Sequence, residues 1–364
     1  MFFIDKHVLK KFDWVSFFII LTLSFIGLLF IFSATYKTST PYSIFFKKQM
    51  FGMLSGALLY LFFSLIDHRQ LIRFGYFLYF VILGLLLFTI IKGSVGMGAK
   101  RWVNLIFLKG QPSELAKLLF PAFAVYFLHT EKEHFNFRFK DFIPILIAMC
   151  TTVLLILKQP DLGTALIILF SGLVIVWLAG IGKKFFIVII VATVSLSPLF
   201  WQMLKPYQKN RVEVFLGFGK SKKERYQIEQ SHISIGSGGI TGKGILKGTQ
   251  NRLMFLPERR TDFIFSVICE ELGFLGALLI IILYTLLFLR IFSIITHIDS
   301  PFTQLFAIGI MFHIFISVVI NLCMVTGLLP IVGIPLPLVS YGLSNLWTTF
   351  ISFGWINSIK IQKT

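Results

Sequence analysis

One segment concentrates charged side chains at the start of a long apolar run. In FLPERRTDFIFSVICEELG, Glu258, Arg259, Arg260 and Asp262 directly precede the apolar residues. Arginine binds phosphate through a bidentate fork, and a positioned carboxylate can remove a proton from an attacking hydroxyl. These residues therefore suit group transfer on a lipid diphosphate at the membrane surface. The structural alternative is that Thr261 or Asp262 is a simple helix N-cap.

Charged residues also stand at or within other apolar runs, where ionisable groups are costly and indicate function or pairing. Glu114 and Lys117, in GQPSELAKLLFP, are three residues apart and hence lie on one helix face within reach of an ion pair. This pair either locks helices together or leaves Lys117 as a contact for an anion. Asp161, in KQPDLGTAL, either caps the next helix or is a buried carboxylate that contacts Lys117 or a divalent cation.

Two further features favour structural interpretations. Glu270 and Glu271 lie about two helical turns beyond Asp262, and we interpret them as groups that hydrogen-bond between helices, with an internal polar cavity as the alternative. The segment 231–248 reads SHISIGSGGITGKGILKG and fails the phosphate-loop pattern at both ends. We expect a compact loop of tight turns there, with backbone amides approaching an anionic ligand as the alternative.

Several common chemistries lack support in this sequence. The three cysteines are far apart, so they indicate neither a disulfide framework nor a metal motif. There is no HExxH pattern and no His/Cys ligand spacing, which argues against a zinc hydrolase. A GxSxG elbow and a Cys–His nucleophile pair are also missing, which argues against a serine or cysteine hydrolase.

The elements that must position the charged residues are membrane helices. Of 364 residues, 56% are hydrophobic and 14% are charged, whereas soluble domains have about 45–50% and about 25%. This composition excludes a soluble enzyme and a disordered chain. The net charge of +18 fits basic loops that lie against anionic lipid. Because no basic stretch belongs to a nucleic-acid-binding motif, we expect no nucleic-acid partner.

We therefore predict an all-α polytopic membrane protein with about ten transmembrane helices, in which residues 1–364 form a single domain. The first apolar run has no small-residue cleavage site before or within it, so we expect a retained span rather than a removed signal peptide. One long loop, 202–263, joins the seventh and eighth spans. The predicted spans are 14–34, 47–66, 72–92, 111–128, 142–158, 162–180, 185–201, 264–291, 302–328 and 340–359.

The distribution of Lys and Arg predicts the orientation. An even number of spans places both termini on one side of the membrane. With the termini inside, the inner segments carry thirteen Lys and Arg against eight in the short outer loops, which favours cytoplasmic termini. The loop 202–263 is then extracytoplasmic, although its own twelve Lys and Arg weaken this argument.

With these motifs in order along the chain, the sequence closely resembles the SEDS family (shape, elongation, division and sporulation). The sequence before FLPER and the VGIPLPLVSYG segment resemble the RodA-type elongation branch more than the FtsW division branch, while the sporulation branch is harder to separate. The motifs that carry the resemblance are RW and QPSELAK between Arg101 and Lys117, KQPDLGTAL at 158–166, QSHISIGSGGITGKGILKGTQ at 230–250, FLPERRTDFIFSVICEELG at 255–273 and TGLLPIVGIPLPLVSYG at 326–342.

The resemblance implies a peptidoglycan glycosyltransferase of the bacterial cytoplasmic membrane. Such an enzyme polymerises lipid II into glycan strands on the outer face of the membrane during cell elongation and so maintains rod shape. The family's catalytic aspartate maps onto Asp262, which would act as general base on the 4-hydroxyl of the acceptor N-acetylglucosamine. Undecaprenyl diphosphate would leave, with inversion at the donor N-acetylmuramic acid.

This single displacement needs one base, and positive charge where the leaving group develops negative charge. Arg101, Lys117, Arg259 and Arg260 are the candidates for contacting the diphosphate. A divalent cation, Mg²⁺ or Mn²⁺, held near Asp262 or Asp161 is a further candidate. Gln111, Glu114 and Asp161 complete the expected substrate-binding set.

The resemblance also implies partners: a class B penicillin-binding protein transpeptidase and other membrane proteins of the elongation complex. The chief alternative function is a flippase or other transporter of a lipid-linked precursor, because transporters also carry charges within the membrane. A non-catalytic membrane scaffold is the third. A glycosyltransferase needs a general base at Asp262 and a transporter does not, so the role of Asp262 distinguishes these two functions.

Overall fold

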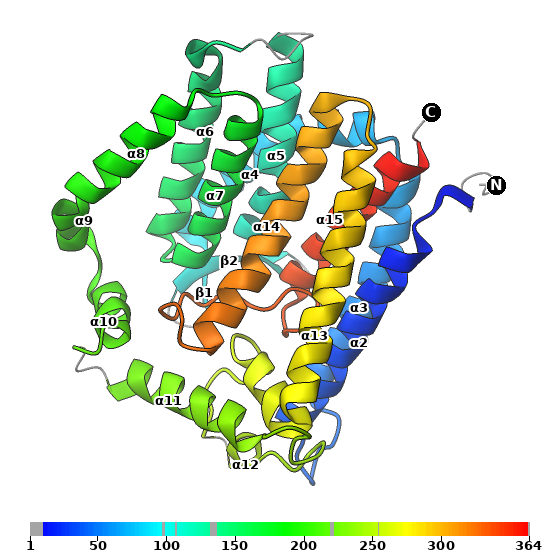
Figure 1. Cartoon of the computed structure of the whole chain (residues 1–364), viewed down its shortest axis with the longest axis vertical. Coiled ribbons are helices and arrows are strands. Elements are labelled where there is room, and N and C mark those ends of the chain that lie inside the picture. Colours follow the sequence, from blue (N-terminus) through cyan, green and yellow to red (C-terminus); the bar gives the residue numbers. More distant parts are fainter. Residues whose placement is uncertain are drawn as a thin grey trace.

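The computed structural model describes residues 10–96, 99–105, 108–131, 137–218, 222–253 and 255–362. In this part of the chain most residues are helical, and the long helices form one bundle (Figure 1). The helices of the first half are α2 (Trp14–Thr35), α3 (Ile44–Leu65), α4 (His68–Lys92), α5 (Pro112–Glu131), α6 (Phe139–Lys158) and α7 (Leu162–Leu178). Those of the second half are α8 (Lys183–Ser195), α9 (Ser197–Met203), α10 (Pro206–Phe215), α11 (Lys222–Ser237), α12 (Thr249–Arg252), α13 (Ile264–Thr296), α14 (Pro301–Val325) and α15 (Leu343–Ile361).

The predicted spans all lie on helices, and the chain is an all-helical multi-span membrane protein apart from one small sheet. Six of the described helices are long and apolar enough to cross a membrane, namely α2, α3, α4, α6, α13 and α14. The remaining predicted spans coincide with helices that are shorter or carry more polar residues, such as the 17-residue α7. The described part of the chain thus has six clear apolar spans together with shorter helices.

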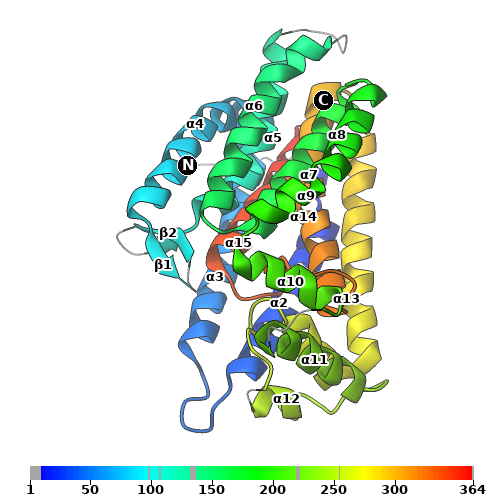
Figure 2. The ribbon, with the colours of Figure 1, turned by 90° about the vertical axis from the view of Figure 1, so that its left-hand side faces the viewer.

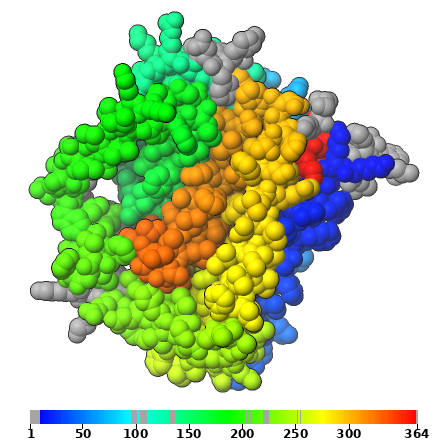
Figure 3. All heavy atoms as spheres, in the orientation of Figure 1, coloured from blue at the N-terminus to red at the C-terminus, as the bar shows by residue number. Residues whose placement is uncertain are grey.

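The predicted span at 185–201 is not continuous, so this expectation was wrong. Helix α8 ends at Ser195 and α9 begins at Ser197, with Leu196 between them. Pro198 has no N–H group to bond back into α8, which explains why the helix stops there. Helix α8 buries none of its residues. The segment from α8 to α10 runs along one side of the bundle, and an opening separates part of it from the other helices (Figures 1 and 3).

Small residues bring the helices around α5 close together. A Cβ atom on Gly56 of α3 would lie 2.5 Å from the Phe350 ring of α15, and one on Gly75 of α4 would lie 2.5 Å from Ala122 of α5. Small residues at such positions allow helices to approach closely in a membrane. Helix α5 is buried from Pro112 to Val125 except at one residue, which places its first turn inside the bundle.

A small antiparallel sheet between α4 and α5 was not predicted. Its strands follow one another in chain order, and Ser94 lies opposite Trp102. The strands have three to seven residues, too short for their alternation to be recognised in the sequence. The sheet carries Arg101 on its central strand. The strands are β1 (Ser94–Gly96), β2 (Ala99–Leu105) and β3 (Leu108–Gly110).

The glycine-rich segment is part helix and part compact loop. Residues 231–237 belong to α11, and 238–248 form turns packed against α13 (Figure 2). The Gly244 N–H donates to the Glu271 carbonyl at 2.9 Å. Gly242 has a φ of +79°, and a Cβ atom there would lie 2.1 Å from the same carbonyl oxygen. These contacts within the protein support the packing interpretation rather than an anion-binding loop.

Glu270 and Glu271 of α13 form hydrogen bonds to this loop and to α2. The Glu270 Oε1 atom accepts hydrogen bonds from Lys243 Nζ at 2.7 Å and from Thr249 Oγ1 at 3.0 Å. The Glu271 carboxylate accepts one from Ser33 Oγ of α2 at 2.6 Å. Both side chains are fully buried. The prediction that they act as hydrogen-bonding groups is confirmed.

Candidate active site

A cavity of about 230 Å³ lies at one end of the bundle, where α5, α7 and β2 meet the segment before α13 and the loop before α15. Its volume is below the roughly 300–1,000 Å³ of a typical small-molecule site, so it suits a reacting group rather than a whole lipid-linked sugar. Seven of the eight predicted site residues line it: Arg101, Gln111, Glu114, Lys117, Asp161, Arg260 and Asp262.

Asp262 lies just before α13 rather than capping it. The N-cap position belongs to Phe263, and no side chain caps this helix end. The N-cap alternative for Thr261 and Asp262 is therefore wrong. Three consecutive backbone carbonyls here accept hydrogen bonds from α14 and the loop that follows it. The donors are Tyr341 N–H to Arg260 at 2.9 Å, Ser340 Oγ to Thr261 at 2.5 Å and Asn321 Nδ2 to Asp262 at 2.9 Å.

The surroundings of Asp262 raise the pKa of its carboxyl group to about 6. Burial is the largest cause, since it disfavours the charged form, and the neighbouring Glu258 charge adds to it. Arg211, Arg101 and a hydrogen bond from Thr261 act in the opposite direction. The side chain is enclosed by protein yet open to the cavity. A carboxyl group with this pKa is mostly ionised at pH 7 and is a stronger base than an ordinary aspartate.

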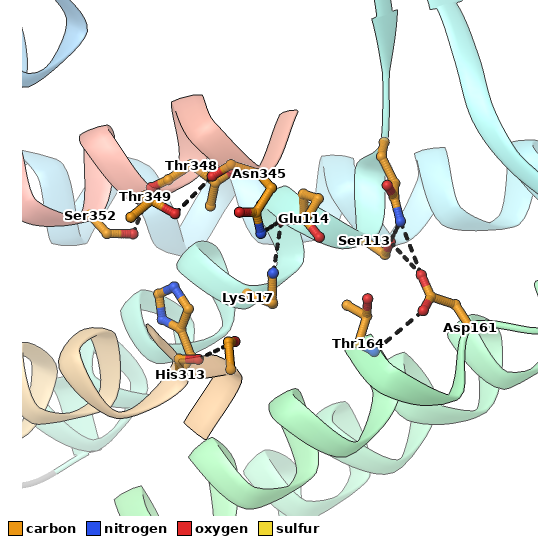
Figure 4. Close-up of polar contacts among 12 residues, drawn as sticks. Ser113, Glu114, Lys117, Asp161, Thr164, His313, Asn345, Thr348, Thr349 and Ser352 are labelled. Atoms are coloured by element: carbon orange, nitrogen blue, oxygen red, sulfur yellow. Dashed lines mark hydrogen bonds and ion pairs between the residues drawn. The ribbon is translucent and has the colours of Figure 1, made fainter. Parts of the chain in front are cut away.

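Glu114 and Lys117 form the predicted ion pair in the first two turns of α5 (Figure 4). The Lys117 Nζ atom lies 2.7 Å from Glu114 Oε2, and both side chains are buried. The same oxygen accepts a hydrogen bond from Asn345 Nδ2 of α15 at 3.0 Å. His313 of α14 and Thr348 of α15 lie beyond Lys117, so polar side chains continue from the cavity into the bundle (Figure 4). The pair therefore joins α5 to α15 while its charged ends line the cavity.

Asp161 is both a helix cap and a buried charge at the cavity wall. Its Oδ1 atom accepts from the Thr164 N–H at 3.3 Å, which confirms the N-cap prediction for α7. Its Oδ2 atom accepts from Gln111 Nε2 at 3.0 Å and from Ser113 Oγ at 3.4 Å (Figure 4). The charged partner is Arg101, with Nη1 3.7 Å from Oδ1. The structure thus pairs Asp161 with Arg101 rather than with Lys117, the partner considered from the sequence.

Arg260 and Arg259 are adjacent in sequence but point to different places. The Arg260 guanidinium lies over the Phe45 ring, 3.9 Å from its centroid, and lines the cavity with Asp262. Arg259 donates from Nε to the Ala34 carbonyl at 2.8 Å and lines a separate hollow. Within the described chain, Arg260 is the cavity cation that has no carboxylate partner within ion-pair distance.

Two residues near the site were not singled out from the sequence. Asn345, which contacts Glu114, is an amide inside a predicted span, and its polarity in an apolar run was an available signal. Arg211, on α10, acts on the pKa of Asp262 and donates from Nη1 to the Val332 carbonyl at 3.3 Å. It is one of twelve basic residues in the predicted long loop, so no local pattern distinguished it.

The described residues contain no group of three or more His, Cys, Asp or Glu side chains that could hold a metal ion. Mg²⁺, however, often binds through one or two carboxylates together with substrate phosphates. Asp161 is already hydrogen-bonded on both oxygens. Among the described cavity residues, Asp262 would hold such a cation together with the phosphates of a bound substrate.

Comparison with known proteins defines the family. Residues 13–364 match the family of cell cycle proteins that comprises FtsW, RodA and SpoVE. The chain is 39% identical to the peptidoglycan glycosyltransferase MrdB of Escherichia coli K12 over 295 residues, which is 79% of this chain and 78% of that protein. It is 34% identical to MrdB of Helicobacter pylori J99, over 98% of this chain and 92% of that protein. The chain therefore belongs to the SEDS family, as its motifs predicted.

Solved structures agree with this assignment. A peptidoglycan synthase complex, described as coordinating polymerization and crosslinking, contains a chain with a TM-score of 0.80 and 29% identity, over 96% of this chain and 97% of that one. The crystal structure of the rod shape determining protein RodA of Thermus thermophilus gives a TM-score of 0.72 and 27% identity, over 97% of each chain. The fold is thus RodA-like along nearly its whole length.

Proposed function

We propose that this SEDS peptidoglycan glycosyltransferase of the RodA/MrdB type polymerises lipid II into glycan strands during cell elongation, with Asp262 as its general base. The observation that carries the proposal is the position of Asp262. It is a carboxylate with a raised pKa in a cavity that also holds Arg101, Lys117 and Arg260. The 31–39% identity to peptidoglycan glycosyltransferases over most of the chain supports the reaction class.

The proposed reaction is one inverting displacement. The 4-hydroxyl oxygen of the acceptor N-acetylglucosamine attacks the anomeric carbon of the donor N-acetylmuramic acid, and its proton passes to the Asp262 carboxylate. The bond between that carbon and the diphosphate oxygen breaks, and its electron pair leaves with undecaprenyl diphosphate. The new bond has the β configuration where the old one was α. No covalent intermediate on the protein is needed.

The cations of the cavity have unequal roles in this proposal. Lys117 is held by Glu114 and Arg101 by Asp161, so each is oriented but partly neutralised. Arg260 has no such partner in the described chain, and its planar guanidinium suits a bidentate contact with phosphate. We assign Arg260 the main contact with the leaving diphosphate, and Arg101 and Lys117 supporting contacts. The predicted contact of Arg259 is left out, because its side chain is directed to Ala34.

In this proposal Gln111 and Asp161 position the Arg101 side chain. Gln111 bonds to Asp161, which in turn lies beside Arg101, so the three residues connect the start of α5, α7 and β2. A divalent cation bound by Asp262 and the diphosphate would neutralise charge on the leaving group. The protein groups carry out the proton transfer and the orientation of the substrate without it.

The proposal places the protein in the bacterial cytoplasmic membrane with both termini in the cytoplasm and the loop 202–263 outside. The excess of Lys and Arg in the inner segments supports this orientation. The cavity then lies at the outer face, where prenyl chains stay in lipid while the sugars reach water. A class B penicillin-binding protein is the proposed transpeptidase partner, alongside other elongation-complex membrane proteins. The likeness to a chain of a synthase complex supports it.

The test compares polymerisation with transport in the same preparation. The purified protein, with a partner that cannot itself polymerise glycan, is supplied with fluorescent lipid II in detergent and in vesicles. We expect glycan strands in gel electrophoresis under both conditions. Movement of lipid II across the vesicle membrane, with no strands under either condition, would instead support the transporter.

A further inference from the structure

A second charged site lies at the opposite end of the bundle from Asp262. Helix α13 starts two residues after Asp262 and is interrupted by a kink at Gly273, whose φ is +68° and ψ is −158°. Near its far end, Arg290 and His297 line a pocket of about 430 Å³ together with Lys10, Lys11 and Lys360. Helix α2 begins and α15 ends at this end of the bundle (Figure 1).

One buried carboxylate organises this pocket. Asp13, with only 2% of its side chain exposed, accepts hydrogen bonds at Oδ1 from Arg290 Nε at 3.0 Å and Nη2 at 2.9 Å, and from Lys360 Nζ at 2.9 Å. Its N–H donates to Asn357 Oδ1 at 3.0 Å. The start of α2 is thereby tied to α13 and α15. The arginine and lysine stay 39% and 25% exposed, so they are held in place and still open to a ligand.

The pocket has more positive charge than this carboxylate can balance. Lys10, Arg290 and Lys360 are basic side chains of this pocket, and in the described structure Asp13 is the carboxylate that accepts hydrogen bonds from Arg290 and Lys360. These three basic side chains around one carboxylate leave an excess of positive charge. A pocket of this kind suits an anion with several acceptor oxygens, such as a phosphodiester.

The rest of the pocket wall is apolar. Ile294, Ile298 and Ile359 line it beside the cations. A free phosphate ion gains nothing from isoleucine side chains, whereas the glycerol and upper acyl carbons of a phospholipid can bury apolar surface against them. Basic pockets between transmembrane helices on the cytoplasmic side are suited to anionic lipid head groups.

We infer that this pocket binds the head group of an anionic phospholipid, through its phosphodiester and the cations around Asp13. The site is separate from the cavity at Asp262 and does not rest on the proposed reaction. Because Asp13 connects the start of α2 to α13 and α15, the bound lipid would lie where these three helices meet. The lipid would contact the part of α13 that follows the kink at Gly273.

The test measures lipid binding by native mass spectrometry of the full-length protein in detergent. Phosphatidylglycerol is titrated into the wild type and into the double variant Lys10→Gln/Lys11→Gln. Two lysines near an anionic head group contribute about 30-fold in affinity, so we expect the first phosphatidylglycerol to bind about 30-fold more weakly. The single variant Lys10→Gln removes one exposed charged side chain, so its affinity for phosphatidylglycerol should fall about fivefold.

The matched control is Lys140→Gln/Lys184→Gln, which removes two exposed lysines from the same predicted face outside the pocket. It should bind phosphatidylglycerol like the wild type, and phosphatidylcholine should bind poorly to all forms. Equal losses in the two double variants would overturn the proposal, because the charge effect would then be general. Displacement of the lipid by millimolar inorganic phosphate would also overturn it, because it would indicate a site for a free anion.

Discussion

Replacing Glu114 by Ala removes the partner of a buried lysine. The two side chains are 6% and 4% exposed, and the Nζ to Oε2 distance is 2.7 Å. Deleting one partner of a buried ion pair costs about 3–5 kcal/mol, because it leaves an uncompensated charge. The same change removes the acceptor of the Asn345 amide. We expect Glu114→Ala to lower the free energy of unfolding by about 3–5 kcal/mol.

The measurement is unfolding in mixed micelles of rising SDS content, followed by tryptophan fluorescence. Glu229→Ala is the matched control, because its pair with Arg225 has the same charges but is 54% and 67% exposed. It should change the free energy by less than about 0.5 kcal/mol. Equal changes for Glu114→Ala and this control would refute the reasoning.

The double variant Glu114→Ala/Lys117→Ala separates structure from catalysis. Removing both charges should restore part of the lost stability, because no buried charge is left unpaired. If the double variant is folded but does not polymerise lipid II, Lys117 has a direct role at the site. Recovery of activity along with stability would show that the pair is purely structural.

Four further predictions use the same preparations. The polymerisation rate should rise with pH through about 6 and then level off, because Asp262 accepts a proton only when ionised. Glu258→Gln removes a charge that raises this pKa, so its acid limb should move to lower pH; a flat profile from pH 5 to 8 in the wild type would contradict both. Asn345→Ala should lower the free energy of unfolding in mixed micelles by about 1–2 kcal/mol, since its hydrogen bond to a charged group is lost. Gly242→Ala should lower it by more than about 1 kcal/mol, because of its positive φ and a carbonyl 2.1 Å from the added atom. Gly182→Ala, at an N-cap with negative φ where the added atom meets nothing within 4 Å, should lower it by less.

The helices could be predicted because lipid imposes a simple rule of length and apolarity on each span. The break at Leu196 could not, because apolar residues continue on both sides and Pro198 alone does not fix where a helix ends. The sheet at 94–110 was not predicted for a different reason. Its pairing joins very short strands, and their register depends on how α4 and α5 position their ends.

Glu114, Lys117, Asp161 and Asp262 were recognised because charge is rare in apolar segments, whereas Arg101 and Gln111 came from the family resemblance. The partners of these residues were not fully predictable. The spacing of three placed Glu114 and Lys117 together, since both lie on one helix. The partner of Asp161 depends on the sheet that carries Arg101, and that sheet was missed. The different contacts of Arg259 and Arg260 depend on the turn after Glu258, whose φ is +49°.

The most direct test of the account is polymerisation of lipid II by Asp262→Asn beside the wild type, each with a partner that cannot polymerise glycan. Asp67→Asn is the matched control, since it makes the same change at a 46% exposed N-cap on α4, where Asn is equally favourable. An amide cannot accept the proton, and general-base catalysis contributes about 10²–10⁴-fold. The account predicts a loss of that size in a folded Asp262→Asn protein and a normal rate for the control. A folded Asp262→Asn protein that polymerises at the wild-type rate would contradict it.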